Sequence, residues 1–126
     1  MKQREQRKFI RYDSLHLLDY LVLDEEGKPG IYSMGRTIDV SLDGLKLETT
    51  TPFPPNTRLL ITVGIEDDLV DLEGQTTHAR QQDGRYISGI TFLKTSKEGR
   101  RVLVKYIEAF QRRKKELDEK SGGVAI

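Results

Sequence analysis

The sequence contains no cysteine, no tryptophan and no long hydrophobic run. Without cysteine, its 126 residues cannot form a disulfide, a thiolate metal site or a cysteine nucleophile. No segment approaches the roughly 20 apolar residues of a membrane span, and no apolar run follows the basic start of the chain. We therefore expect a soluble, cytoplasmic protein with one domain, because a chain of this length supports one modest core.

Recognisable catalytic motifs are also missing. The sequence has no P-loop, no H-E-x-x-H motif and no Gly-x-Ser-x-Gly turn. Its two histidines, His16 and His78, fall in separate expected strands, where a histidine is more often a packed or surface residue than a catalyst. We expect a binding protein rather than an enzyme, and we assign no catalytic residue, metal site or cofactor.

Charge is unevenly distributed along the chain although the net charge is only +1. Residues 1–11 carry a balance of +4 and residues 94–126 a balance of +5, whereas residues 12–93 carry −8. Basic ends therefore flank an acidic body. This pattern is compatible with solvated ends, with ends that lie against the body, or with an anion site in one of them.

Alternating apolar residues and regular turn signals predict a β-rich domain. Gly and Pro cluster at 26–30, a rigid proline-rich loop follows at 52–56, and Gln82-Asp83-Gly84 is a further tight turn. Gly74 interrupts one strand and is predicted to mark a bulge or bend. Six short strands favour a small antiparallel barrel, which avoids exposed edges by closing. The expected strands are 15–23, 31–40, 45–49, 58–65, 69–79 and 86–93.

The last part of the chain has helical periodicity. Residues 95–98 offer a capping box, and an apolar stripe follows at Val102, Leu103, Tyr106, Ile107 and Phe110. The stripe is predicted to pack on the open end of the barrel, the alternative being a partner. The expected organisation is a flexible basic arm at 1–12, a barrel at 13–93, an amphipathic helix at 94–119 and a disordered tail at 120–126.

Two short polar motifs carry the functional signal. Arg7 and Arg11 are four residues apart, and guanidinium groups bind phosphates and the O6/N7 edge of guanine. Asp39 and Ser41 alternate on one strand and should point to the same face. Gly44 follows, and we expect it to adopt the positive φ of a tight turn. Each motif alone also occurs by chance in ordinary surface segments.

The order and spacing of the two motifs resemble the PilZ domain family. That family has an Arg-x-x-x-Arg segment before the first strand and an (Asp/Asn)-x-Ser-x-x-Gly segment after the second, here residues 7–11 and 39–44. Residues 88–92, Ser-Gly-Ile-Thr-Phe, are similar to the end of the family's last strand. The resemblance spans roughly residues 5–115. It implies a six-stranded antiparallel PilZ-type β-barrel with a C-terminal α-helix.

The resemblance also implies a ligand, cyclic di-GMP. Arg7 and Arg11 would then hold phosphates and guanine edges, Asp39 and Ser41 would hydrogen-bond a guanine, and Gly44 would permit the turn. Family members often have a third arginine just before the first motif arginine, where this chain has Gln6. This departure leaves open whether one ligand or a stacked pair is bound. Arg4 and Lys8 are additional candidates for ligand contact.

The expected function is that of a stand-alone receptor acting through an unidentified protein effector. Ligand binding would order the arginine arm over the barrel and so change the surface presented to that effector. Two alternatives stay open. One is a small nucleic-acid-binding barrel with basic ends, although the acidic body and the lack of an aromatic stacking surface argue against specific nucleic-acid binding. The other is a ligand-free PilZ-like adaptor.

Overall fold

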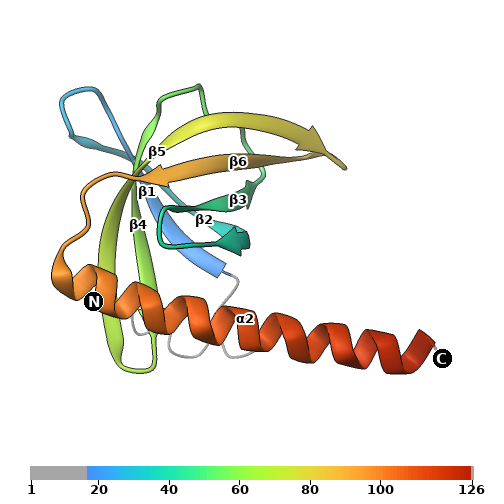
Figure 1. The fold of residues 1–126 in the computed structure, drawn as a ribbon. Helices are drawn as coiled ribbons and strands as arrows, with labels where there is room; N and C mark the ends of the chain where they lie inside the picture. Colours follow the sequence, from blue (N-terminus) through green and yellow to red (C-terminus); the bar gives the residue numbers. More distant parts are fainter. Residues whose placement is uncertain (1–16, 126) are drawn as a thin grey trace.

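Six strands and one helix make up the described part of the chain. The computed structural model describes residues 17–125. The strands form a closed antiparallel barrel in the order β1-β2-β3-β6-β5-β4, which confirms the predicted fold class (Figure 1). The elements are β1 (Leu17–Leu23), β2 (Pro29–Val40), β3 (Gly44–Thr49), β4 (Arg58–Ile65), β5 (Asp68–Gln82), β6 (Arg85–Phe92) and α2 (Lys97–Ala125).

The core of the barrel follows from a period of two that is clearest in β3 and β4. In β4, Leu59, Ile61 and Val63 are fully buried, while the residues between them face outward. Similar alternation places Leu45 and Leu47 of β3 in the same core. The alternating pattern read from the sequence is therefore the physical cause of the strands. The apolar side chains on one face of each strand are removed from water only when the sheet closes into a barrel.

The strand register shifts at three places, one of them between β1 and β2 at Leu21–Leu23. The other two lie near the cavity described below. In β2, Ile38 is an extra residue between Thr37 and Asp39, so that the register against β3 shifts there. In β5, the register against β6 shifts between Thr76 and Ala79. Gly74 was predicted to be the irregular position, but it pairs regularly with Phe92. A Cβ at Gly74 would lie 2.6 Å from Cγ2 of Ile90, so glycine is required there by close packing.

Helix α2 closes one end of the barrel and extends beyond it (Figure 1). Its residues Val102, Leu103, Tyr106 and Phe110 are buried, and the last three belong to the barrel core. The stripe therefore packs on the barrel, as predicted. A buried hydrogen bond of 3.0 Å joins the Tyr106 hydroxyl to Oγ1 of Thr37 on β2. The aromatic rings of Tyr106 and Phe110 are 6.1 Å apart.

The two ends of α2 differ from the expectation. The helix is capped by Ser96, whose Oγ accepts a hydrogen bond from the Gly99 amide at 3.0 Å. With Ser96 as the cap, the third helical residue is Gly99. Glycine has no side chain to bond back to the cap amide, so the predicted capping box does not form. At the other end, the helix continues to Ala125, where a disordered tail had been expected from 120. Strong helix formers fill most of 112–120, and adding residues to an existing helix is easier than starting one. Residues 121–123, Ser-Gly-Gly, are poor helix formers, so helix propensity does not explain the last turn.

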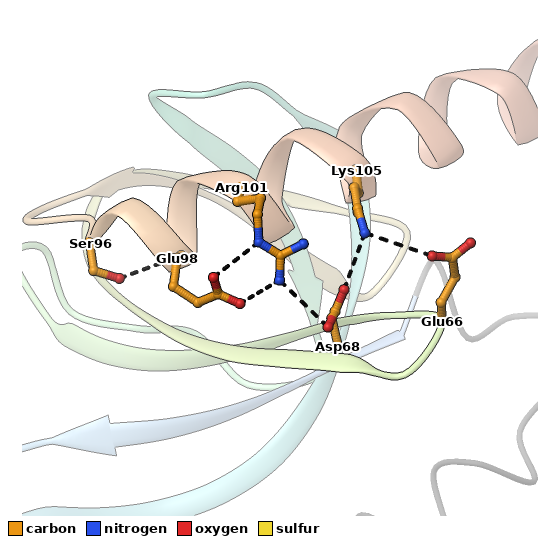
Figure 2. Close-up of polar contacts among 7 residues, drawn as sticks. Glu66, Asp68, Ser96, Glu98, Arg101 and Lys105 are labelled. Carbon is orange, nitrogen blue, oxygen red and sulfur yellow. Dashed lines mark hydrogen bonds and ion pairs between the residues drawn. The ribbon is translucent and has the colours of Figure 1, made fainter.

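A group of charged side chains fastens the start of α2 to the turn between β4 and β5 (Figure 2). Arg101 lies between Glu98 and Asp68, and it reaches Asp68 at 3.6 Å. Lys105 lies between Asp68 at 3.3 Å and Glu66 at 4.0 Å. The hydrogen bond from Arg101 lowers the pKa of the Glu98 carboxyl. Because these groups are exposed or only half-buried, the contacts orient the helix more than they stabilise it.

Burial raises the pKa of the Tyr106 hydroxyl to about 12, against the opposing effect of its hydrogen bond to Thr37. In the unfolded chain this hydroxyl titrates near pH 10. Between pH 10 and 12, we expect the free energy of unfolding to fall by up to about 1.4 kcal/mol per pH unit through this residue alone. Below pH 10, its contribution does not depend on pH. Urea unfolding at several pH values, compared with Tyr106→Phe, measures this slope, and equal slopes in both proteins would contradict it.

No helix in residues 17–125 is both long enough and apolar enough to cross a bilayer. The long helix α2 is charged over much of its length, with four consecutive cations at 112–115.

Candidate functional site

The second polar motif forms the hairpin between β2 and β3. Asp39 is the next-to-last residue of β2, Ser41 begins the turn and Gly44 begins β3. Asp39 and Ser41 are exposed, whereas Val40 between them is buried. The predicted alternation is therefore present. It directs a carboxylate and a hydroxyl outward from the barrel wall.

Hydrogen bonds hold this hairpin in place. The Ser41 amide donates to the Gly44 carbonyl at 2.8 Å, and the Asp43 amide donates to Oγ of Ser41 at 3.3 Å. The Phe92 amide on β6 donates to the Asp43 carbonyl at 2.8 Å. Asp39 accepts a hydrogen bond from the Val40 amide at 3.0 Å. The turn is thus tied to the neighbouring strand, and its polar groups are held at fixed positions.

Gly44 has a different role from the one expected. Gly27 and Gly84 are the described glycines with positive φ, so Gly44 does not use the left-handed region. A Cβ on Gly44 would lie 2.0 Å from the carbonyl oxygen of Ile90 and 3.2 Å from Cα of Thr91. Glycine is needed here because the backbones of β3 and β6 come very close together. The turn-based explanation was wrong, although Gly44 does line the candidate cavity described below.

The three motif residues line one cavity of ≈ 290 Å³ on the outside of the barrel. The cavity crosses four adjacent strands, because Asp39 pairs with Lys46 and Lys46 pairs with Gly89. Beyond Gly89, Oγ1 of Thr77 on β5 donates to the Gly89 carbonyl at 3.2 Å. The bulges in β2 and β5 lie on either side of the cavity, and bulges commonly redirect side chains at such sites.

Sequence reasoning missed several residues of this cavity. Lys46, Thr77, Gly89 and Thr91 line it together with the motif. Lys46 looked like an ordinary outward residue of an alternating strand, and its pairing with Asp39 depends on the bulge. The pairing of β3 with β6, which brings Gly89 and Thr91 to the cavity, joins strands that are distant in sequence.

The other predicted site residues lie outside the described part of the chain. These are Arg7 and Arg11 of the first motif and the additional candidates Arg4 and Lys8. Among the described residues, the cavity is lined by carboxylates, by hydroxyls and by one cationic side chain, that of Lys46. Among residues 17–125, no cluster of three or more His, Asp or Glu is placed to hold a metal ion.

Comparisons with known proteins identify the family. The family model of the PilZ domain matches residues 5–109, which include both motifs. No curated protein matches the chain significantly. Among solved structures, the chain is similar to the crystal structure of the PilZ domain of CeSA from a cellulose-synthesizing bacterium. The TM-score is 0.55 and the identity 15%, over 76% of this chain and 92% of that one. The chain therefore belongs to the PilZ domain family, a family of cyclic di-GMP receptors.

Proposed function

We propose that this protein is a receptor that binds cyclic di-GMP at the cavity on the β2–β3 hairpin. The observation that carries the proposal is that Asp39, Ser41 and Gly44 line this single cavity. These residues make up the family's second motif, and the matched region also contains Arg7 and Arg11 of the first. In the proposal, the two arginines complete the site, and the bound form is read by a protein effector.

The chemistry of the cavity suits a guanine base. The exposed carboxylate of Asp39 accepts hydrogen bonds from base N–H groups, and the Ser41 hydroxyl both donates and accepts. A Cβ on Gly89 would lie 2.8 Å from Oγ1 of Thr77, so glycine at this position lets the Thr77 hydroxyl lie close to the backbone of β6. Lys46, directly opposite Asp39, supplies a cation near a phosphate. The hairpin that carries Asp39 and Ser41 is already held by its own hydrogen bonds.

The cavity has room for only part of a dinucleotide. Pockets for whole ligands usually measure about 300–1,000 Å³, and this one is at the lower limit. The remaining contacts are assigned to the segment 1–12, whose arginines carry the forked donors that phosphates favour. Fixing five residues of this segment costs about 5–10 kcal/mol. Because the ligand contacts offset this cost, the segment lies on the barrel only when the ligand is bound. In the proposal, the effector recognises this change in position.

Isothermal titration with cyclic di-GMP tests the proposal. We expect saturable binding, with GTP and cyclic GMP much weaker. Arg7→Ala, Arg11→Ala and Asp39→Ala should each lose ~1.5–3 kcal/mol, the contribution of a hydrogen bond to a charged group. This corresponds to roughly a ten- to hundredfold weaker affinity. The stoichiometry of the titration also decides whether one ligand or two bind.

Asp67→Ala is the matched control, because Asp67 is an exposed carboxylate on the turn between β4 and β5. It should bind as the wild type does. Unchanged affinity in all three site variants would refute the assignment. Binding of mixed oligonucleotides with a steep salt dependence, in place of cyclic di-GMP, would favour the nucleic-acid alternative.

A further inference from the structure

A second cavity lies at the end of the barrel away from α2. It measures ≈ 550 Å³ and lies between the β1–β2 turn and the loop from β3 to β4. Figure 1 shows these two connections at the opposite end of the barrel from the helix. We call this cavity the proline-loop groove. None of its lining residues is shared with the cavity at Asp39.

One wall of the groove is the proline loop, residues 51–57 between β3 and β4. Side-chain hydrogen bonds hold this loop in place. The carbonyl of Pro54 accepts from the hydroxyls of Thr57 at 2.6 Å and Thr76 at 3.0 Å. Thr76 is buried, and its hydroxyl also accepts from the Thr57 amide at 2.9 Å. These threonines fix a loop that contains three prolines at 52–55. A loop held in this way loses little conformational freedom when it binds something.

The opposite wall is also fixed. Oδ1 of Asp24 accepts hydrogen bonds from the amides of Glu26 at 2.9 Å and Lys28 at 2.8 Å. The Gly27 amide donates to the Asp24 carbonyl at 2.9 Å, and Gly27 has the positive φ that the turn requires. The groove is thus preformed, as binding sites usually are.

The groove combines apolar walls with an acidic rim. Tyr20 and Phe53 make an edge-to-face contact at 5.3 Å on its inner side, with Val22 beside them. Ile31 is 71% exposed at its edge, which is unusual for so apolar a side chain on a strand. Asp24 and Glu25 also line the groove. Arg58, the cation among the lining residues, is already paired with Glu73.

We propose that the proline-loop groove binds an extended segment of a partner protein in which an apolar side chain is flanked by lysine or arginine. The apolar side chain would pack against Phe53 and Ile31, and burial of both surfaces supplies the affinity. The carboxylate charges of Asp24 and Glu25 on the rim select a basic flank and disfavour an acidic one. Because the two cavities share no residue, this inference does not depend on cyclic di-GMP binding.

Selection from a random 12-residue phage-display library against the wild-type protein tests the inference. We expect enrichment of peptides with an apolar residue next to lysine or arginine. A selected peptide, labelled and measured by fluorescence polarisation, should bind Ile31→Ser roughly tenfold or more weakly. Glu25→Lys should also weaken binding, and should reduce its dependence on salt. Both positions are exposed, so the variants should fold normally.

Leu93→Ser and Glu108→Lys are matched controls, because they change an exposed leucine and an exposed glutamate outside the groove. Both should bind the peptide as the wild type does. A selection without a basic-apolar pattern, or equal binding to Ile31→Ser and wild type, would overturn the inference. Self-association that Ile31→Ser abolishes, without peptide enrichment, would assign the groove to a second copy and also overturn it. Failure of cyclic di-GMP binding would leave the peptide results unchanged, so the two proposals can fail separately.

Discussion

Replacing Tyr106 with alanine should lower the free energy of unfolding by about 3–5 kcal/mol, the usual range for removing a large buried aromatic side chain. Tyr106 is fully buried and belongs to the core cluster that α2 shares with the barrel. Its loss would leave a cavity between the helix and the barrel. It would also remove a partner of Thr37, a buried hydroxyl on β2. Domains usually unfold with a total free energy of about 5–15 kcal/mol, so this loss would be a large part of the stability.

Two further variants separate packing from hydrogen bonding. Tyr106→Phe keeps the ring and removes only the hydroxyl, so it should cost about 1–2 kcal/mol because Thr37 loses its partner. Val104→Ala changes an exposed position two residues away and should stay within about 0.5 kcal/mol of wild type. Urea denaturation followed by circular dichroism gives all three values. A Tyr106→Ala variant as stable as Val104→Ala would mean that the helix does not contribute to the core.

Replacing Gly44 with alanine should remove about 3 kcal/mol of stability and also weaken ligand binding. The added Cβ would lie 2.0 Å from the carbonyl oxygen of Ile90. Such an overlap with backbone cannot be relieved by a rotamer change, so the cost should be at the upper end of that for overpacking. The first residue of β3 must then move away from Thr91, its partner on β6. This movement displaces the turn that carries Ser41.

Gly27→Ala is the matched control for this prediction. Gly27 has a positive φ of 82° but nothing within 4 Å of its added Cβ. The control should therefore lose only about 1–2 kcal/mol from backbone strain. It should leave cyclic di-GMP affinity unchanged, because Gly27 is outside the cavity at Asp39. Thermal unfolding and titration of both variants provide the comparison. Equal losses of stability and unchanged affinity in Gly44→Ala would contradict the close-approach explanation.

The strands were predictable because their cause is local. In Arg58–Ile65, alternating Leu, Ile and Val gave the bounds that the structure has. The roles of two glycines were not predictable in this way. Gly44 was assigned a turn and Gly74 a bulge, yet both are glycine because β6 passes close to them at Ile90. Sequence periodicity contains no information on which strand lies beside which.

The same limit applies to the candidate site. Asp39, Ser41 and Gly44 were found because they are close together in the sequence. Lys46 was missed because its pairing with Asp39 depends on a bulge. Thr77 was missed because the non-consecutive pairing of β3 with β6 brings β5 to the cavity. The N-terminal cap of α2 was ambiguous for a local reason. Thr95 and Ser96 can both act as cap residues, and the start of the helix at Lys97 selects Ser96. A single sequence shows which functional residues are neighbours along the chain, but the fold is needed to show which residues meet across strands.

The last part of α2 extends beyond its contact with the barrel, so the end of this contact acts as a pivot. Phe110 is the last buried residue among the described side chains of the helix, and the helix continues to Ala125. At 1.5 Å per residue, about 22 Å of helix extends beyond this pivot. A tilt of about 10° at the pivot would displace the far end by about 4 Å. Small changes in the contact between Thr37 and Tyr106 are therefore magnified at the end of the helix, where a spectroscopic label would report them most sensitively.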